Sequence, residues 1–180
     1  MDDDIFAVIH LSGMSNDASC ELNVDLTGKA NVDATKNLLE ISKISGVKRF
    51  LFASSCSVYG FIGTDVSADE NHEFNPISAY AQSKIDCEEF ILPEANNDFV
   101  VAALRKATLY GPSARMRFDL VINSMTGMAV SEGQIIVNGG SQWRPLLHVE
   151  DAADAYIYML ETEKDKINGK PFNIGSNKQN

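Results

Sequence analysis

Tyr80 and Lys84 are two side chains whose types and spacing suit proton transfer. A separation of four residues on a helix places both side chains on one face, one turn apart. A neighbouring ammonium favours the phenolate, so we expect Tyr80 to act as a general base nearer to neutral pH than an isolated phenol, whose pKa is about 10. The same spacing is common on solvated helix faces, so its meaning depends on the surrounding elements.

A cluster of serines lies upstream of this pair. Residues 49–53 (RFLFA) are typical of a buried strand, and they lead directly into Ser54, Ser55 and Ser57. Ligands bind at the carboxyl edge of parallel sheets, so these hydroxyls are candidates for contact with a substrate. Turn formation and helix capping are the alternative roles of serine here. The connection that follows, residues 56–78, is too long to be only a linker, and such loops usually carry function.

Apolar runs alternate with helical periods along the chain and predict an α/β fold. In the first part we expect buried strands and helices in turn: strands at 6–11, 49–53 and 99–104, and helices at 25–45 and 79–91. This order predicts right-handed crossovers and a parallel sheet with helices on both faces. After Gly111 we expect two helices, 120–130 and 149–161, and three short strands, 134–137, 144–148 and 171–174.

The composition indicates a globular protein and argues against two classes of partner. The chain has 180 residues, of which 44% are hydrophobic, and no apolar run approaches the ~18 residues of a membrane span. Its formal net charge of −10 argues against a nucleic-acid partner. The acidic start lacks the features of a secretory signal, so we expect a cytoplasmic protein. Three cysteines without a Cys-x-x-Cys pair predict neither a disulfide framework nor a metal site.

Five motifs together resemble the extended short-chain dehydrogenases. They are VIHLSG (8–13), FASSCSVYG (52–60), YAQSK (80–84), LRKATLYGP (104–112) and WRPLLHVED (143–151). Among these enzymes the chain most resembles the NAD-dependent epimerase/dehydratase family, which acts on nucleotide sugars. The resemblance implies a partial Rossmann-type domain in residues 1–110, which carries the catalytic residues. It also implies part of a smaller substrate-binding lobe in residues 111–180, with a helix and a strand that return to the sheet.

The resemblance further implies a role for each matching residue. Ser55 would bond the reacting hydroxyl, Tyr80 would remove its proton, and Lys84 would bind the nicotinamide ribose of NAD. Hydride would pass to NAD and return to the other face of a keto intermediate, which inverts the sugar carbon. Cofactor-binding positions are matched by Tyr80 and Lys84 themselves and by Leu11, Ser12, Gly13, Met14, Ser15, Asn31, Ser54 and Ala107. Substrate-binding positions are matched by Ser55, Cys56, Ser57, Thr108 and Arg144.

The sequence departs from the family pattern in four places. It contains no Gly-x-x-Gly-x-x-Gly, and it stops soon after residues 173–176. We therefore expect both ends to be cuts through a longer protein, and the chain alone to bind NAD weakly and to be inactive. Cys56 and Ser57 stand where dehydratases have an acidic pair, which favours an epimerase or a reductase. Thr108 and Pro145 stand where the family often has Asn and Asp, which leaves the sugar and the nucleotide open.

Two other functions stay open at this point. One is an NADPH-dependent short-chain reductase of a small carbonyl substrate, since NADP could replace NAD. The other is a truncated, inactive relative that serves as an interaction module, because a parallel sheet without its first strands has an unpaired edge. The resemblance also implies that the full-length protein is a homodimer, formed through the helices predicted at 25–45 and 79–91.

Overall fold

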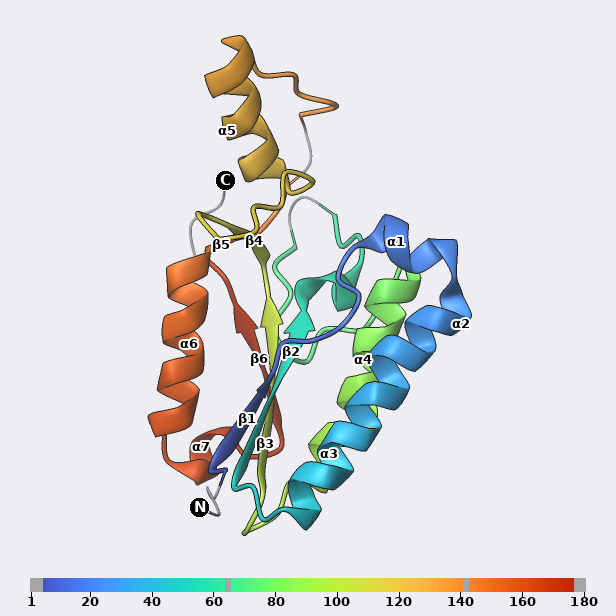
Figure 1. The fold of residues 1–180 in the computed structure, drawn as a ribbon, viewed down its shortest axis with the longest axis vertical. Helices are drawn as coiled ribbons and strands as arrows, with labels where there is room; N and C mark the ends of the chain where they lie inside the picture. The colour runs from blue at the N-terminus through green and yellow to red at the C-terminus, as the bar shows by residue number, and fades with distance from the viewer. Residues whose placement is uncertain (1–4, 64–65, 141–142, 177–180) are drawn as a thin grey trace.

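The computed structural model describes residues 5–63, 66–140 and 143–176. Its main sheet has four strands, all parallel to their neighbours, in the order β1-β2-β3-β6 (Figure 1). These strands are β1 (Ala7–His10), β2 (Arg49–Ser55), β3 (Val100–Lys106) and β6 (Lys170–Ile174). The α/β class and the parallel sheet predicted from the sequence are confirmed.

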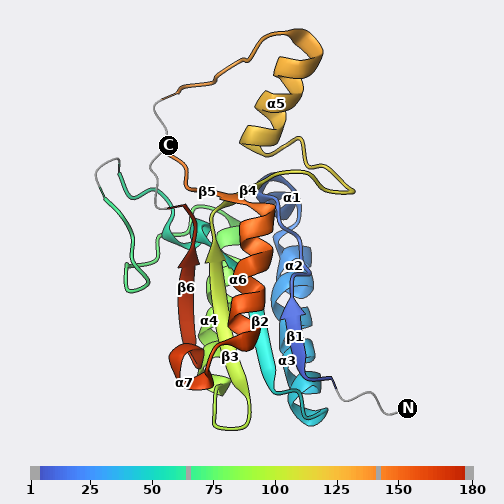
Figure 2. The same cartoon turned by 90° about the vertical axis from the view of Figure 1, so that its left-hand side faces the viewer.

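Helices cover both faces of this sheet, as the two views in Figures 1 and 2 show. Helices α3 (Ala34–Ile44) and α4 (Ala79–Ile91) cover one face, and α6 (Val149–Glu161) covers the other. Phe50 and Phe52 pack toward α3 and α4, whereas Leu51 and Leu104 pack toward α6. Because both faces are buried, the strands are continuous apolar runs, which explains why the sequence predicted them.

The helix predicted at 25–45 consists of three segments. α2 (Val24–Thr27) runs into a π-helical turn, η1 (Gly28–Asp33), which continues into α3. A further helix that the sequence analysis missed, α1 (Asp17–Leu22), precedes them. Its amino end is capped by Asn16, whose side chain accepts a hydrogen bond from the Ser19 N–H at 3.1 Å. This cap was a readable signal.

After residue 107 the chain first leaves the main sheet and then returns to it. β4 (Thr108–Tyr110) and β5 (Leu146–His148) form a separate parallel pair, and α5 (Val121–Glu132) projects beyond them (Figure 2). α6, α7 (Lys164–Ile167) and β6 then pack back against the main sheet. Two short 3₁₀ segments, η2 (Cys56–Tyr59) and η3 (Leu92–Glu94), complete the elements of the described residues.

The strand predicted at residues 134–137 is wrong. These residues are in no regular element, and the side chains of Ile135, Ile136 and Val137 are more than half exposed. A strand needs a neighbour for its backbone hydrogen bonds, and within the described residues none pairs with this segment.

Among the described helices, none is both long and apolar enough to cross a membrane.

Candidate functional site

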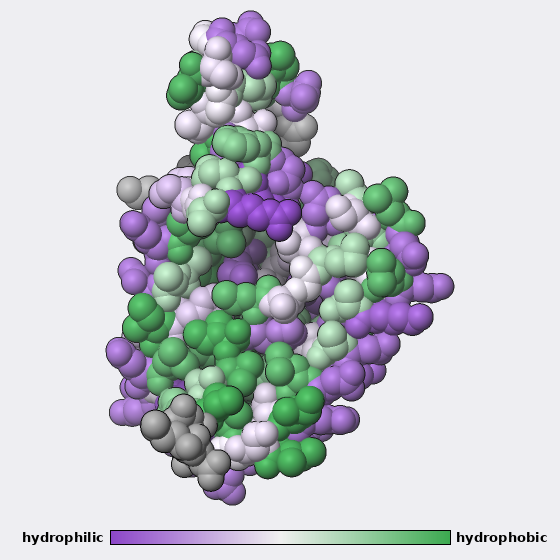
Figure 3. All heavy atoms as spheres, in the orientation of Figure 1, coloured by the Kyte–Doolittle hydropathy of each residue, from purple (hydrophilic) through white to green (hydrophobic). Residues whose placement is uncertain are grey.

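Ser55, Tyr80 and Lys84 lie together at the carboxyl edge of the sheet. β2 ends at Ser55, and α4 begins at Ala79, so the fold delivers all three side chains to one place. Tyr80 forms a hydrogen bond with Ser55. The Lys84 ammonium lies 5.5 Å from the centre of the Tyr80 ring and 4.7 Å from that of Phe52. In the space-filling view the surface is hollowed between α6 and the segment that follows β1 (Figure 3).

The electrostatics of this group differ from the sequence-based expectation. Burial raises the pKa of the Tyr80 phenol, and the hydrogen bond with Ser55 only partly opposes that rise. Burial likewise lowers the pKa of Lys84, whose side chain is 5% exposed. The pKa of Tyr80 thus moves away from neutrality and not, as the sequence had predicted, toward it, because desolvation of the phenolate is the largest influence on it.

Asn31 fixes the turn that follows β1. Its Oδ1 accepts a hydrogen bond from the Met14 N–H at 2.7 Å, and its Nδ2 donates to the Met14 carbonyl at 3.0 Å. The same Nδ2 donates to Ser83 Oγ at 3.0 Å, and Ser83 directly precedes Lys84 on α4. Gly13 has a φ of +142°, and a Cβ at this position would lie 2.9 Å from Asn31 Oδ1. Asn31, Gly13 and Met14 thus form one unit that is tied to the helix carrying Lys84.

The loop before α5 also reaches this turn. Arg117 Nη1 donates to Ser15 Oγ at 2.9 Å, and Asn16 Nδ2 donates to Asp119 Oδ2 at 2.8 Å. Arg117 and Asp119 pair with each other at 2.5 Å between Nη2 and Oδ2. Ser15 is therefore held by a residue from the later part of the chain. The two other predicted residues of the turn have exposed side chains: Leu11 and Ser12.

A buried ion pair that the sequence analysis missed lies beneath the site. Arg105 Nη2 is 2.6 Å from Glu88 Oε2, and the two side chains are 3% and 2% exposed. The Ser54 hydroxyl donates to the same carboxylate, and Arg105 Nη1 donates to Tyr59 Oη at 2.8 Å. Burial alone would lower the pKa of Arg105, but the hydrogen bonds and charge of Glu88 raise it. The signal was a charged residue at the end of an apolar strand.

Two of the predicted cofactor residues, Ser54 and Ala107, have no free polar side-chain group at the sheet edge. The Ser54 side chain is occupied by Glu88, which leaves only its backbone to face a cofactor. Ala107 is buried, and its N–H donates to the Ile174 carbonyl at 2.8 Å. Both residues lie at the sheet edge, but neither side chain offers a free polar group there.

The predicted substrate residues lie on the other side of Ser55. Ser57 donates to Ser55 Oγ from both its N–H, at 3.2 Å, and its hydroxyl, at 3.0 Å. Burial raises the pKa of Cys56 to about 11, although the charge of Arg144 opposes this rise. Thr108 opens β4, and its N–H donates to the Pro145 carbonyl at 3.0 Å. The structure thus brings Thr108 next to the segment that carries Arg144, and Arg144 within electrostatic reach of Cys56.

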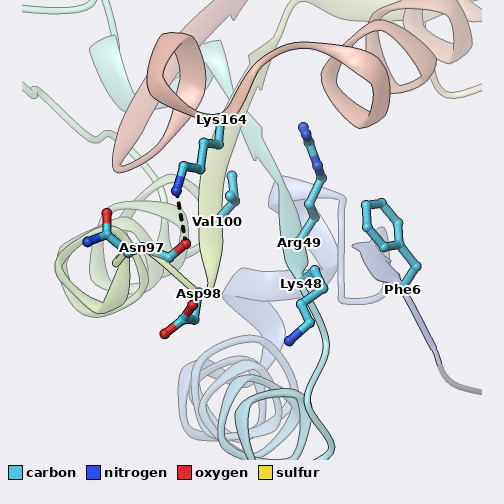
Figure 4. Close-up of a pocket in the computed structure, with 7 residues that line it drawn as sticks. All are labelled: Phe6, Lys48, Arg49, Asn97, Asp98, Val100 and Lys164. Atoms are coloured by element: carbon cyan, nitrogen blue, oxygen red, sulfur yellow. Dashed lines mark hydrogen bonds between the residues drawn. The ribbon is translucent and has the colours of Figure 1, made fainter.

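Two hollows lie away from the Ser55–Tyr80–Lys84 group. One, of about 580 Å³, lies beside β4 and β5 and is lined by Tyr110, His148 and Asp151 among others. The other, of about 310 Å³, lies at the amino ends of β2 and β3 and contains no predicted site residue (Figure 4). In the described part of the chain, no three His, Cys, Asp or Glu side chains are grouped as metal ligands.

Comparison with known proteins identifies the relatives of this chain. Residues 1–175 match the NAD dependent epimerase/dehydratase family. The chain is 31% identical over 180 residues to a putative UDP-glucose 4-epimerase of Methanocaldococcus jannaschii, with 98% of this chain and 57% of the relative covered. It is 30% identical over 176 residues to a UDP-N-acetyl-alpha-D-glucosaminuronate decarboxylase of Bacillus cytotoxicus, with 94% and 53% covered.

Solved structures show the same similarity. MoeE5 in complex with UDP-glucose and NAD matches with a TM-score of 0.84 and 31% identity, over 98% of this chain and 58% of that one. The UDP-glucuronic acid 4-epimerase of Bacillus cereus, in complex with UDP-glucuronic acid and NAD, matches with a TM-score of 0.83 and 28% identity, over 98% and 56%. The chain spans little more than half the length of these relatives. With its Rossmann-type fold and a family match over nearly its whole length, this chain belongs to the NAD-dependent epimerase/dehydratase family.

Proposed function

We propose that the protein is an NAD-dependent nucleotide-sugar epimerase that works through a transient keto intermediate. The observation that carries the proposal is the meeting of Ser55, Tyr80 and Lys84 at one sheet edge. Its relatives include a putative UDP-glucose 4-epimerase and a UDP-glucuronic acid 4-epimerase, which supports a nucleotide sugar as the substrate.

The residues of the site fit the nicotinamide riboside end of the cofactor. The buried Lys84 ammonium has no hydrogen-bond acceptor within the described residues, so its donors are available to ribose hydroxyls. The turn held by Asn31 and Gly13 would face the same end. When bound, NAD would accept and return the hydride. No Gly-x-x-Gly-x-x-Gly occurs in the sequence, so these residues account for this end of the cofactor and not for its phosphates.

Each of the three side chains has a separate role in the proposed proton transfer. In the proposal, Ser55 bonds the reacting hydroxyl and Tyr80 takes its proton. The Lys84 ammonium, 5.5 Å from the Tyr80 ring centre, stabilises the negative charge that develops on the phenol oxygen. Because burial raises its pKa, Tyr80 is protonated at neutral pH and is equally suited to the return step, in which it donates a proton to the ketone oxygen.

Cys56 gives independent support for an epimerase over a dehydratase. Dehydration needs an acid and a base beside the catalytic hydroxyl, and Cys56 stands at one of these positions. Since burial raises its pKa to about 11, its thiol is protonated at neutral pH and is a poor proton acceptor. Cys56 is therefore unsuited to serve as the base that dehydration requires at this position.

Replacing Tyr80 with phenylalanine tests this mechanism. In the protein expressed from its full open reading frame, Tyr80→Phe is expected to slow sugar epimerisation by a factor of about 10² to 10⁴ while NAD still binds. Tyr158→Phe is the matched control, because Tyr158 lies on α6 with its side chain 64% exposed. Unchanged turnover in Tyr80→Phe would remove the residue from the mechanism.

A reductase is the second candidate, and the raised pKa of Tyr80 favours it specifically. A reductase needs a phenol that is protonated before the reaction begins, which is the state that burial favours here. The two candidates differ in cofactor turnover. A reductase consumes reduced nicotinamide in proportion to product, whereas an epimerase retains its NAD through the cycle. Absorbance at the reduced-nicotinamide band during turnover separates them. Separate reactions supplied with NADPH or with NADH show which of the two is the donor.

The remaining expectations are also proposals. We propose that residues 1–110 belong to the cofactor-binding domain and residues 111–180 to the substrate lobe, in a cytoplasmic homodimer. Exposed apolar side chains on α2 and α3 support the dimer: Leu26 is 50%, Ile41 60% and Ile44 87% exposed. Replacing Ile41 and Ile44 with lysine is expected to convert the dimer to a monomer in sedimentation velocity.

The interaction-module hypothesis rests on β1. Within the described residues β1 is an outer strand of the sheet, and the side chains of Phe6 and Ile9 are 57% and 38% exposed. Such an edge can pair with another chain. Failure of the protein from the full open reading frame to bind NAD would favour this hypothesis over either enzyme.

A further inference from the structure

A second lysine lies beside Ser55. Lys106 is the last residue of β3, and it pairs in register with Ser55, the last residue of β2. Register partners in a sheet project from the same side, and here that side is the one covered by α6. The Lys106 ammonium lies 5.5 Å from the ring centre of Tyr156 on that helix. Lys106 thus lies on the opposite face of the sheet from α4, which carries Lys84.

In the described part of the chain, neither the Lys106 ammonium nor the Tyr156 hydroxyl has a polar partner. Within residues 5–63, 66–140 and 143–176 the Lys106 ammonium makes no hydrogen bond or ion pair, and the buried Tyr156 hydroxyl makes none either. Burial, and to a lesser extent the charge of Lys84, lowers the pKa of Lys106 to about 8. Tyr156 is buried and Lys106 is partly buried. Leaving the Tyr156 hydroxyl and a largely desolvated ammonium without partners is costly, so a group that accepts hydrogen bonds is expected to complete this arrangement.

The strand order indicates which ligand supplies that group. The turn proposed to face the cofactor follows β1, Ser55 ends β2, and Lys106 ends β3. Lys106 is therefore on the side of Ser55 that lies away from the cofactor turn. The chain continues from Lys106 into Thr108 on β4, which pairs with the segment that follows Arg144. This is the side on which the proposed substrate residues lie.

We propose that Lys106 determines specificity by binding a carboxylate on the sugar, close to the carbon that reacts at Ser55. The Tyr156 hydroxyl is the second donor to this group. The inference rests on the proposed function of the site as a nucleotide-sugar site, and it narrows the substrate to acidic sugars. A compact ammonium in a desolvated place favours a carboxylate strongly over a neutral hydroxymethyl group.

Calorimetric titration with a matched pair of sugars tests the inference. UDP-glucuronic acid and UDP-glucose differ at the group in question and share the rest of the molecule. With the protein from the full open reading frame and NAD present, the acid is expected to bind about 10- to 100-fold more tightly, as a charge-assisted hydrogen bond predicts. Lys106→Met is expected to bring this ratio close to one, whereas Lys106→Arg retains much of it.

A charge-matched control separates a local effect from a general one. Lys48→Met makes the same change in net charge at the amino end of β2, where Lys48 lines the distant hollow (Figure 4). It is expected to leave the ratio unchanged. Because binding is measured, a preference for the acid that depends on Lys106 supports the inference even if no sugar is turned over, and then only the proposed epimerase activity fails.

Three results would overturn the inference. The first is equal affinity of the unmodified protein for both sugars, or binding of neither. The second is a preference for the acid that survives in Lys106→Met. The third is a loss of NAD affinity in Lys106→Met with the sugar preference intact, which would assign the ammonium to the cofactor.

Discussion

Replacing Arg105 with methionine is expected to destabilise the protein strongly, because it leaves a buried carboxylate without its cation. Arg105 donates to Glu88 through Nε, at 3.1 and 3.0 Å, and through Nη2, at 2.6 Å. It also donates to the Glu70 carbonyl at 2.9 Å. In Arg105→Met, Glu88 would keep only the Ser54 hydroxyl as a donor while remaining 2% exposed.

The structure sets the expected magnitude. Breaking a buried ion pair by removing one partner costs about 3 to 5 kcal/mol, which is a large share of the ~5 to 15 kcal/mol that stabilises a typical domain. Removing both charges costs far less, since no unpaired charge is left in the interior. The double variant Glu88→Leu with Arg105→Met is therefore expected to regain most of the stability that Arg105→Met loses.

Urea unfolding followed by circular dichroism measures both effects, because the free energy of unfolding follows from the midpoint and the slope. Arg117→Met is the matched control. Its pair with Asp119 is similarly short, but the two side chains are 36% and 42% exposed, so a loss of no more than about 1 kcal/mol is expected. If Arg105→Met loses no more stability than Arg117→Met, then burial does not govern the strength of these pairs and our reasoning is wrong.

Three further predictions follow from contacts and pKa values. Asn31→Ala removes the three hydrogen bonds to Met14 and Ser83. It is expected to lower the free energy of unfolding in urea by about 1 to 3 kcal/mol and to weaken NAD binding. An unchanged NADH affinity in fluorescence titrations would contradict the expected loss of cofactor binding. Cys56, whose pKa is raised to about 11, is expected to react with iodoacetamide at neutral pH roughly 10²-fold more slowly than a free thiol, and the rate should rise with pH up to that value. Because the folded pKa of Lys106 is lowered from 10.5 to about 8, the unfolded chain binds more protons between these values and stability should rise with pH there. Lys106→Met lacks this rise and is expected to be more stable at neutral pH by up to about 3 kcal/mol, so parallel stability curves for the two proteins would refute the prediction.

Much of the fold could be predicted because its strands are buried on both faces. The runs around Phe50 and Val101 are continuously apolar and do not alternate with polar residues, as a half-exposed strand would. Both lie at the centre of the sheet. The helix at 79–91 was predicted with its observed limits. Ser78 caps its amino end, with the Ala81 N–H donating to Ser78 Oγ at 3.2 Å, and Pro93 follows its carboxyl end.

Elements that depend on tertiary partners were harder to predict. β4 has three residues, and it is a strand only because β5, far along the chain, lies beside it. The apolar run at 134–137 has the composition of a strand but no such neighbour in the described residues. Local sequence carries the propensity of a segment and not the presence of its partner.

In the candidate site, too, local geometry could be predicted from the sequence, whereas properties that depend on tertiary packing could not. The spacing of Tyr80 and Lys84 was enough to predict that they share a helix face, because that follows from helical geometry. Their pKa values could not be predicted, because the depth of burial that raises one and lowers the other depends on the surrounding elements. Arg105 and Lys106 were not recognised, since a charged residue at the end of an apolar strand reads as the end of the strand and not as part of a site.

The π-helical turn between α2 and α3 has a consequence for how this region tolerates insertions and deletions. Thr27, Asn31, Thr35 and Leu39 follow one another at intervals of four residues, and each is less than 5% exposed. A regular α-helix has 3.6 residues per turn, so such a row would drift around its axis, and the wider turn of η1 offsets part of that drift. Loss of a single residue from 28–33 would rotate the flanking helical segments relative to each other by about 100° and turn Asn31 away from Met14. The length of this short segment is therefore under a tighter constraint than most of its side chains.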